Sequence, residues 1–205
     1  METTALFRAE LGAVRWGPVA GLAVGSGALL GADAAGWLGG PGGLSLWVGL
    51  GALAAALAFV MDDPSRALLA ACAVTGRQRL GIRLLVWVAG AAAWTGYTAA
   101  TTRWLGSTGL DATALLVAGV GVLVLTGAAA VAAHNRAALD EPGTAVGSAA
   151  VVGVLTTVMV QSRLGDVRPL SVTELTGETR VLWSVVMMLA IGALVWATSD
   201  PWRSG

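Results

Sequence analysis

The chain has 205 residues, of which 56% are hydrophobic and only 12% are charged, and its mean hydropathy is +0.77. Because a soluble domain carries roughly a quarter of its residues as charges, this composition excludes an ordinary water-soluble domain and predicts a chain surrounded by lipid. Twelve acidic residues balance twelve arginines, so there is no basic field to attract nucleic acid. The absence of lysine excludes a Walker A phosphate loop, and the chain cannot by itself be a P-loop ATPase.

Residues 1–16 are predicted to form an amphipathic helix. On a helical wheel Phe7, Leu11 and Val14 share one face, whereas Arg8 and Arg15 share another. Such a helix lies in the plane of the membrane interface, with its apolar face in the lipid. We expect it at the cytoplasmic surface, before the first membrane span.

Residues 17–205 are predicted to form one all-α integral membrane domain with six transmembrane helices. Crossing about 30 Å of hydrocarbon takes roughly 20 helical residues, and six apolar stretches approach that length. They cover residues 17–38, 43–61, 84–102, 112–133, 144–160 and 181–198. The first stretch contains Asp33 near one end, where we expect the carboxylate to reach the headgroup region.

Arginine placement predicts the orientation, because basic loops stay on the cytoplasmic side. With the N-terminus inside, eight arginines fall in cytoplasmic segments and four in external ones. The cytoplasmic ones are Arg8, Arg15, Arg66, Arg77, Arg79, Arg83, Arg136 and Arg203, and the external ones are Arg103, Arg163, Arg168 and Arg180. Both termini are therefore expected in the cytoplasm.

The cytoplasmic segment 62–83 joins the second and third predicted spans. Asp63 is a good N-cap and Pro64 a good first helical residue, so we expect a short apolar helix that ends at Thr75-Gly76. The acidic pair at 62 and 63 also suggests a metal or pyrophosphate site, but no second acidic cluster accompanies it, which favours a helix cap. The arginines at 77, 79 and 83 either anchor the chain near lipid phosphates or contact a partner protein.

The external segment 161–180 contains Ser171-x-x-Glu174, the pattern of a capping box. The span before it, 144–160, is short. Together these features predict short helices that dip into the outer leaflet, since non-helical backbone at that depth needs burial against protein.

Three of the nine tryptophans are candidates for lining a substrate path. The other six fall at or near the ends of spans, as an interfacial aromatic belt requires, and they are Trp16, Trp37, Trp104, Trp183, Trp196 and Trp202. The three that lie deeper are Trp47, Trp87 and Trp94. Packing within the bundle is the alternative role of these three residues.

Two runs of sequence resemble the membrane subunit of an ABC-2 type (type V) exporter. The first run comprises Asp62-Asp63-Pro64-Ser65-Arg66, Leu68-Leu69-Ala70 and Val74-Thr75-Gly76-Arg77-Gln78-Arg79. It is similar to the coupling helix that joins the second and third spans in that family. The second run, Ala5-Leu6-Phe7-Arg8-Ala9-Glu10-Leu11, is similar to the common start of these permeases.

The resemblance implies a permease that is driven by a separate ABC ATP-binding subunit, which binds the coupling segment. The residues that it assigns to this contact are Asp62, Asp63, Pro64, Arg66, Leu68, Leu69, Val74, Arg77, Gln78 and Arg79. ATP and Mg²⁺ would be bound by the partner, and this chain would hold no cofactor. A homodimer, or a heterodimer with a second permease chain, would enclose the path.

In the resembled family the fifth span borders the centre of the dimer, which adds Thr156, Thr157, Met159 and Gln161 to the path candidates. The implied substrate is a hydrophobic or amphipathic small molecule, or a lipid-like compound, moved outward across a bacterial plasma membrane. The alternative function is a small polytopic membrane enzyme, or an accessory membrane protein with no ATPase partner.

Overall fold

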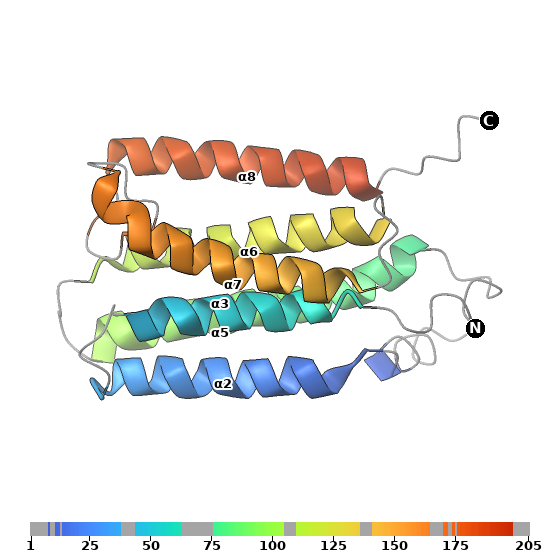
Figure 1. The fold of residues 1–205 in the computed structure, drawn as a ribbon, viewed down its shortest axis with the longest axis horizontal. Helices are drawn as coiled ribbons and strands as arrows, with labels where there is room; N and C mark the ends of the chain where they lie inside the picture. The colour runs from blue at the N-terminus through green and yellow to red at the C-terminus, as the bar shows by residue number, and fades with distance from the viewer. Residues whose placement is uncertain are drawn as a thin grey trace.

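The structure is a computed structural model in which the described residues form helices and connecting segments (Figure 1). It describes residues 8, 11–12, 14–37, 44–62, 76–104, 110–135, 141–164, 170–171, 174 and 176–198. The elements are α2 (Trp16–Ala34), α3 (Leu44–Phe59), α5 (Gly76–Trp104), α6 (Ala112–Asn135), α7 (Pro142–Val160), the 3-10 helix η1 (Gln161–Arg163) and α8 (Gly177–Thr198). A helix occupies each predicted span, so the all-α class is confirmed.

The long helices lie side by side and alternate in direction, so that α2 begins and α8 ends at the same end of the bundle (Figure 1). The helices α2 and α8 form opposite edges. Between them, α3 packs against α2, α5, α6 and α7, and α6 packs against α3, α5, α7 and α8. Of the 16 residues of α3, 11 are buried, so this central helix contacts protein rather than solvent or lipid.

Three helices of the described chain are long and apolar enough to cross a membrane, namely α6, α7 and α8. In the apolar stretch of α6, 67% of the residues are buried, against 17% in the corresponding stretches of α7 and α8. The outer faces of α7 and α8 carry large apolar side chains, among them Met159, Leu189 and Ile191. These helices indicate a membrane protein. The apolar stretch of α3, Leu44–Phe59, is shorter than a full crossing.

Tryptophan rings fill the space between α5 and α6 by lying against glycines. A Cβ at Gly119 would overlap the ring of Trp94, and one at Gly127 would lie 3.1 Å from the ring of Trp87. The buried indole N–H of Trp94 donates to the backbone oxygen of Leu115 at 3.2 Å. Both tryptophans therefore belong to the core of the bundle.

The N-terminal amphipathic helix predicted for residues 1–16 falls largely outside the described residues. Helical backbone is described at Arg8, Leu11 and Gly12. Val14, which the prediction placed in lipid, is instead buried against Val19 and Val60 of the bundle. At this position the apolar face meets protein.

The segment 161–180, which was predicted to be external, begins with the short helix η1 and returns to the bundle at Leu170, which is buried in the core. The Ser171 hydroxyl accepts the N–H of Glu174 at 3.4 Å, half of the predicted capping box. No helix is assigned at either residue. Residues 165–169, 172–173 and 175, where the predicted dipping helices would continue, lie outside the described part of the chain.

Candidate functional site

A polar junction closes the end of the bundle where segment 62–83 begins and ends. Nη1 of Arg83, on α5, donates hydrogen bonds to the backbone oxygens of Val60, Met61 and Asp62 at 3.2, 3.1 and 3.2 Å. These oxygens lie just beyond the C-terminus of α3, in the turn whose N–H groups cap the last carbonyls of that helix. Arg83 is buried, so one buried cation holds the two ends of the segment together.

The Asp62 side chain joins this junction to α7. Its Oδ1 accepts the N–H of Gly143, in the first turn of α7, at 2.6 Å. Glu141, at the N-cap position of α7, makes no side-chain capping bond, so a carboxylate from another segment supplies the cap. Oδ2 of Asp62 is buried and has no hydrogen-bond partner among the described residues. Burial raises the pKa of the Asp62 carboxyl above 3.8, against the opposing effect of the Gly143 N–H.

Close packing brings α7 and α3 together at the same place. A Cβ at Gly143 would lie 2.6 Å from Cα of Phe59, and one at Gly147 would lie 3.3 Å from Cα of Ala55. The two glycines, four residues apart, therefore let the helix backbones approach each other closely. We call Asp62, Arg83 and Gly143 the Asp62–Arg83 junction. It fastens α3, α5 and α7 to one another.

An exposed ion pair lies beside the junction. Arg15, directly before α2, pairs with Glu141, directly before α7, at 2.6 Å, and the two side chains are 47% and 50% exposed. Exposed pairs contribute only about 0–1 kcal/mol to stability. The pair therefore orients the ends of α2 and α7 more than it stabilises them.

Only part of the predicted coupling site lies in the described chain. Asp62 is described in full, and the backbone of Arg77, Gln78 and Arg79 lies in the first turns of α5. The side chains of those three residues fall outside the description, as do Asp63, Pro64, Arg66, Leu68, Leu69 and Val74 altogether.

Two sequence interpretations change at the junction. Asp62 caps a helix, but this helix is α7, and Gly143 lies 81 residues away, whereas the N-cap predicted at Asp63 lies outside the described residues. Arg83, for which the sequence suggested a contact with lipid phosphates or a partner, is buried and donates to backbone oxygens of its own chain. No local pattern marks either contact, because both join segments that are distant in the sequence.

A second polar cluster lies at the opposite end of the bundle. Asp33, near the end of α2, is fully buried. Its Oδ1 accepts a hydrogen bond from the Ser45 hydroxyl at 2.6 Å, and its Oδ2 accepts one from the Tyr97 hydroxyl at 3.1 Å. The prediction that Asp33 reaches the headgroups is wrong. Hydroxyls from α3 and α5 replace the water that a buried carboxylate would otherwise need.

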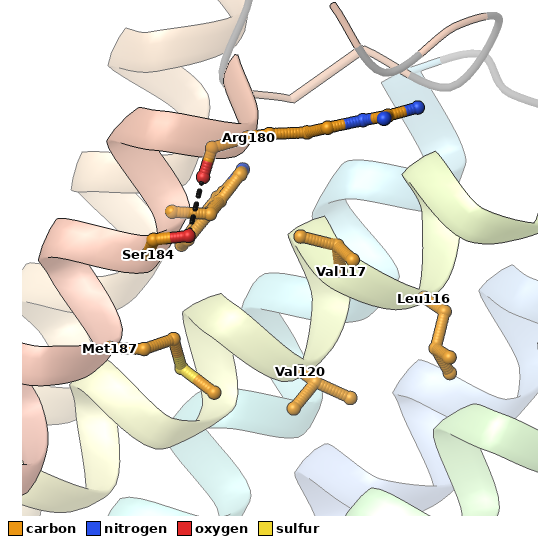
Figure 2. Close-up of a pocket in the computed structure, with 7 residues that line it drawn as sticks. Leu116, Val117, Val120, Arg180, Ser184 and Met187 are labelled. Atoms are coloured by element: carbon orange, nitrogen blue, oxygen red, sulfur yellow. Dashed lines mark hydrogen bonds between the residues drawn. The ribbon is translucent and has the colours of Figure 1, made fainter. Parts of the chain in front are cut away.

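Two cavities lie beside α8, and Trp183 lines both. The larger one, which we call the α6–α8 groove, has a volume of about 500 Å³ (Figure 2). It is lined by Leu116, Val117, Val120, Arg180, Trp183, Ser184 and Met187. The smaller cavity, of about 280 Å³, lies between α6, α7 and α8. A Cβ at Gly121 would overlap the Trp183 ring, so this glycine makes room for the ring beneath α8.

The predicted path residues of the fifth span are spread over different environments. Thr157 lines the smaller cavity, and its hydroxyl donates to the backbone oxygen of Gly153 at 2.7 Å. Thr156 is exposed on α7, and Met159 is 77% exposed. Gln161 is partly buried at the start of η1. The structure therefore places Thr157 at a cavity and its neighbours on or near the outer surface.

The predicted path tryptophans lie in the core. Trp47, Trp87 and Trp94 are all buried, and none of them lines either of the two cavities. Trp183, which sequence reasoning assigned to an interfacial belt, is the tryptophan that lines both. Its position near a span end gave no signal for this role.

Comparison with known proteins adds no assignment: no family model matches the chain, no curated protein matches it, and no solved structure matches it. Within the described ranges, no group of three or more His, Cys, Asp or Glu side chains is placed to hold a metal ion. The candidate site is therefore defined by the geometry of the junction and the two cavities.

Proposed function

We propose that the chain is the membrane-spanning permease subunit of an ATP-binding-cassette exporter. A separate ATPase subunit, which holds ATP and Mg²⁺, would engage segment 62–83 and supply the energy that this lysine-free chain cannot. The Asp62–Arg83 junction carries the proposal, because hydrogen bonds tie the ends of this segment to each other and to α7. A movement of the segment would therefore be transmitted to α3, α5 and α7.

This movement would reach the smaller cavity, since α7 forms one of the walls of that cavity. Its lining is apolar apart from Trp183, Thr126 and Thr157, and the two threonine hydroxyls donate to backbone oxygens of their own helices. Such a wall suits a hydrophobic or amphipathic small molecule or a lipid-like compound. The proposal includes six spans in a bacterial plasma membrane, cytoplasmic termini, and a homodimer or heterodimer that encloses the path.

Assembly with an ATPase tests the proposal. The tagged full-length chain is purified in mild detergent from its native membranes, and ATP hydrolysis by any ATP-binding-cassette protein that co-purifies is measured. Arg66→Glu and Leu69→Glu, in the predicted contact, are expected to abolish co-purification. Arg103→Glu changes an exposed arginine at the opposite end of the bundle and should leave the complex intact. Full assembly of the two segment variants would contradict the proposal.

A variant of the junction separates binding from transmission. Arg83→Gln removes the guanidinium bonds to three backbone oxygens and leaves the predicted contact residues unchanged. We expect the ATPase to remain bound but its stimulation by this subunit to fall at least tenfold, an effect of about 1.4 kcal/mol on the coupled step. Unchanged stimulation in a correctly folded variant would show that force does not pass through the junction.

A second candidate, a proton-coupled carrier that needs no ATPase partner, rests on Asp33. A carboxylate that is buried against protein within membrane helices is typical of proton relays. In that case Asp33→Asn would abolish transport in vesicles that contain this chain alone and carry a pH gradient. An ATP-driven exporter would show no such transport, with or without the substitution.

A further inference from the structure

The α6–α8 groove combines an apolar wall with one cation at its end. Arg180 lies in the first turn of α8, and its side chain extends over the end of the groove where Leu116 and Val117 lie (Figure 2). Met187 lines the groove seven residues further along α8, which is about 10 Å deeper at 1.5 Å per residue. The polar end therefore lies at the level of the helix ends, and the apolar part extends into the bundle.

The guanidinium at this end is available to a ligand. Arg180 is exposed, and among the described residues no acidic side chain forms an ion pair with it. The neighbouring hydroxyl, that of Ser184, donates to the backbone oxygen of Arg180 at 2.9 Å. The unbalanced charge is complementary to an anion, and the planar guanidinium matches the oxygens of a phosphate.

The position of the groove identifies what covers it. The helix α8 forms an edge of the bundle and packs against α6. Its outward residues, including Val181, Val185 and Met188, are exposed and apolar, as expected of a helix that faces hydrocarbon. The groove is thus bordered by lipid-facing surface, and the molecule at hand to fill it is a lipid of the bilayer.

The free energy of lipid binding indicates that Arg180 determines which lipid the groove selects. Acyl chains are as apolar as the groove wall, so moving a chain from bulk lipid into the groove gains no hydrophobic free energy. The headgroup contact alone can then distinguish one lipid from another. We infer that the α6–α8 groove binds an anionic phospholipid, with its phosphate on Arg180 and one acyl chain along Val117, Val120 and Met187. This inference does not depend on an ATPase partner.

Site-resolved photolabelling tests the inference. The purified chain is reconstituted in phosphatidylcholine vesicles that contain a trace of phosphatidylglycerol or phosphatidylcholine with a photoreactive acyl chain. Labelled peptides are then mapped by mass spectrometry. We expect labelling of residues 116–120 and 183–187 to be several-fold stronger with phosphatidylglycerol. Arg180→Gln should lower this preference about fivefold, the size expected for one basic side chain at a membrane surface.

Matched variants keep the test specific. Arg163→Gln removes the same charge from an exposed arginine at the same end of the bundle, outside the groove, and should preserve the preference. Val120→Trp fills the groove and should remove labelling there by both lipids, while Val152, exposed on α7, stays labelled. Equal labelling by the two lipids, or no effect of Arg180→Gln, would overturn the inference. So would the absence of groove labelling, which would indicate that a second copy of the chain covers the face.

Discussion

At the scale of single residues, glycines on α6 decide how closely tryptophan rings can approach. The rings of Trp94 and Trp183 occupy the positions that a Cβ would take at Gly119 and Gly121. Sequence reasoning considered the tryptophans but not the glycines against which they pack, because this pairing depends on the register between helices. Hydropathy contains no information on that register.

Gly121→Ala is expected to destabilise the protein by about 1–3 kcal/mol, since the new methyl group forces the Trp183 ring to move. The apparent melting temperature of the purified chain in detergent measures the effect. Gly192→Ala, on α8, is the control, because a Cβ there meets nothing within 4 Å. Equal melting temperatures for the two variants would contradict the packing role of Gly121.

The charged residues Asp33 and Arg83 show a further limit of sequence reasoning. Because an isolated charge is costly in hydrocarbon, a single sequence favours placing both at a membrane surface. In the structure their partners come from distant parts of the chain, for Asp33 from 12 and 64 residues away and for Arg83 from the residues just beyond α3. These hydrogen-bond partners of the two charged side chains can be identified only once the helices are packed together.

At the scale of elements, long apolar runs were enough to locate the long helices of the described chain but not their ends. The helix α5 begins at Gly76, well before the predicted span at residue 84, because a helix can continue into water after its apolar stretch ends. The helix α8 begins at Gly177, where the Thr176 hydroxyl accepts the N–H of Thr179 at 3.3 Å. A capping signal, rather than hydropathy, marks that start.

The cap on α7 has a pH dependence that Asp62→Asn should remove. The folded-state pKa of Asp62 is raised above 3.8 by burial, so folding favours the protonated carboxyl. The resulting stabilisation is fully present below the unfolded-state pKa and is lost as pH rises through the raised folded-state pKa. We expect the melting temperature of the wild-type chain to fall, relative to Asp62→Asn, as pH rises from about 3.8.

Glu178→Gln provides the comparison, because Glu178 is an exposed carboxyl at the opposite end of the bundle. Its melting curve should follow the wild-type pH dependence. If the wild-type chain and Asp62→Asn gave parallel curves between pH 3.5 and 8, the buried carboxyl would not control the stability of the α7 terminus.

At the scale of the whole molecule, the alternation of the long helices places the start of α2 and the end of α8 together (Figure 1). With the predicted orientation, Glu141 faces the cytoplasm and Arg103 the exterior. In a Cys72→Ser background, Arg103→Cys should react with a membrane-impermeant maleimide on intact cells. Glu141→Cys should react only after the cells are opened. The reverse labelling pattern would show that the orientation is inverted.

The shortness of α3 bears on how the protein is made. Its 16 residues rise about 24 Å at 1.5 Å per residue, less than the ~30 Å of a hydrocarbon core, and it is surrounded by helices rather than acyl chains. During synthesis α3 emerges before α6 and α7, which later enclose it. A nascent chain that stops before Pro142 would lack the helix that Asp62 caps. We therefore expect such truncated chains to be degraded by quality-control proteases, and stable insertion to await the arrival of α7.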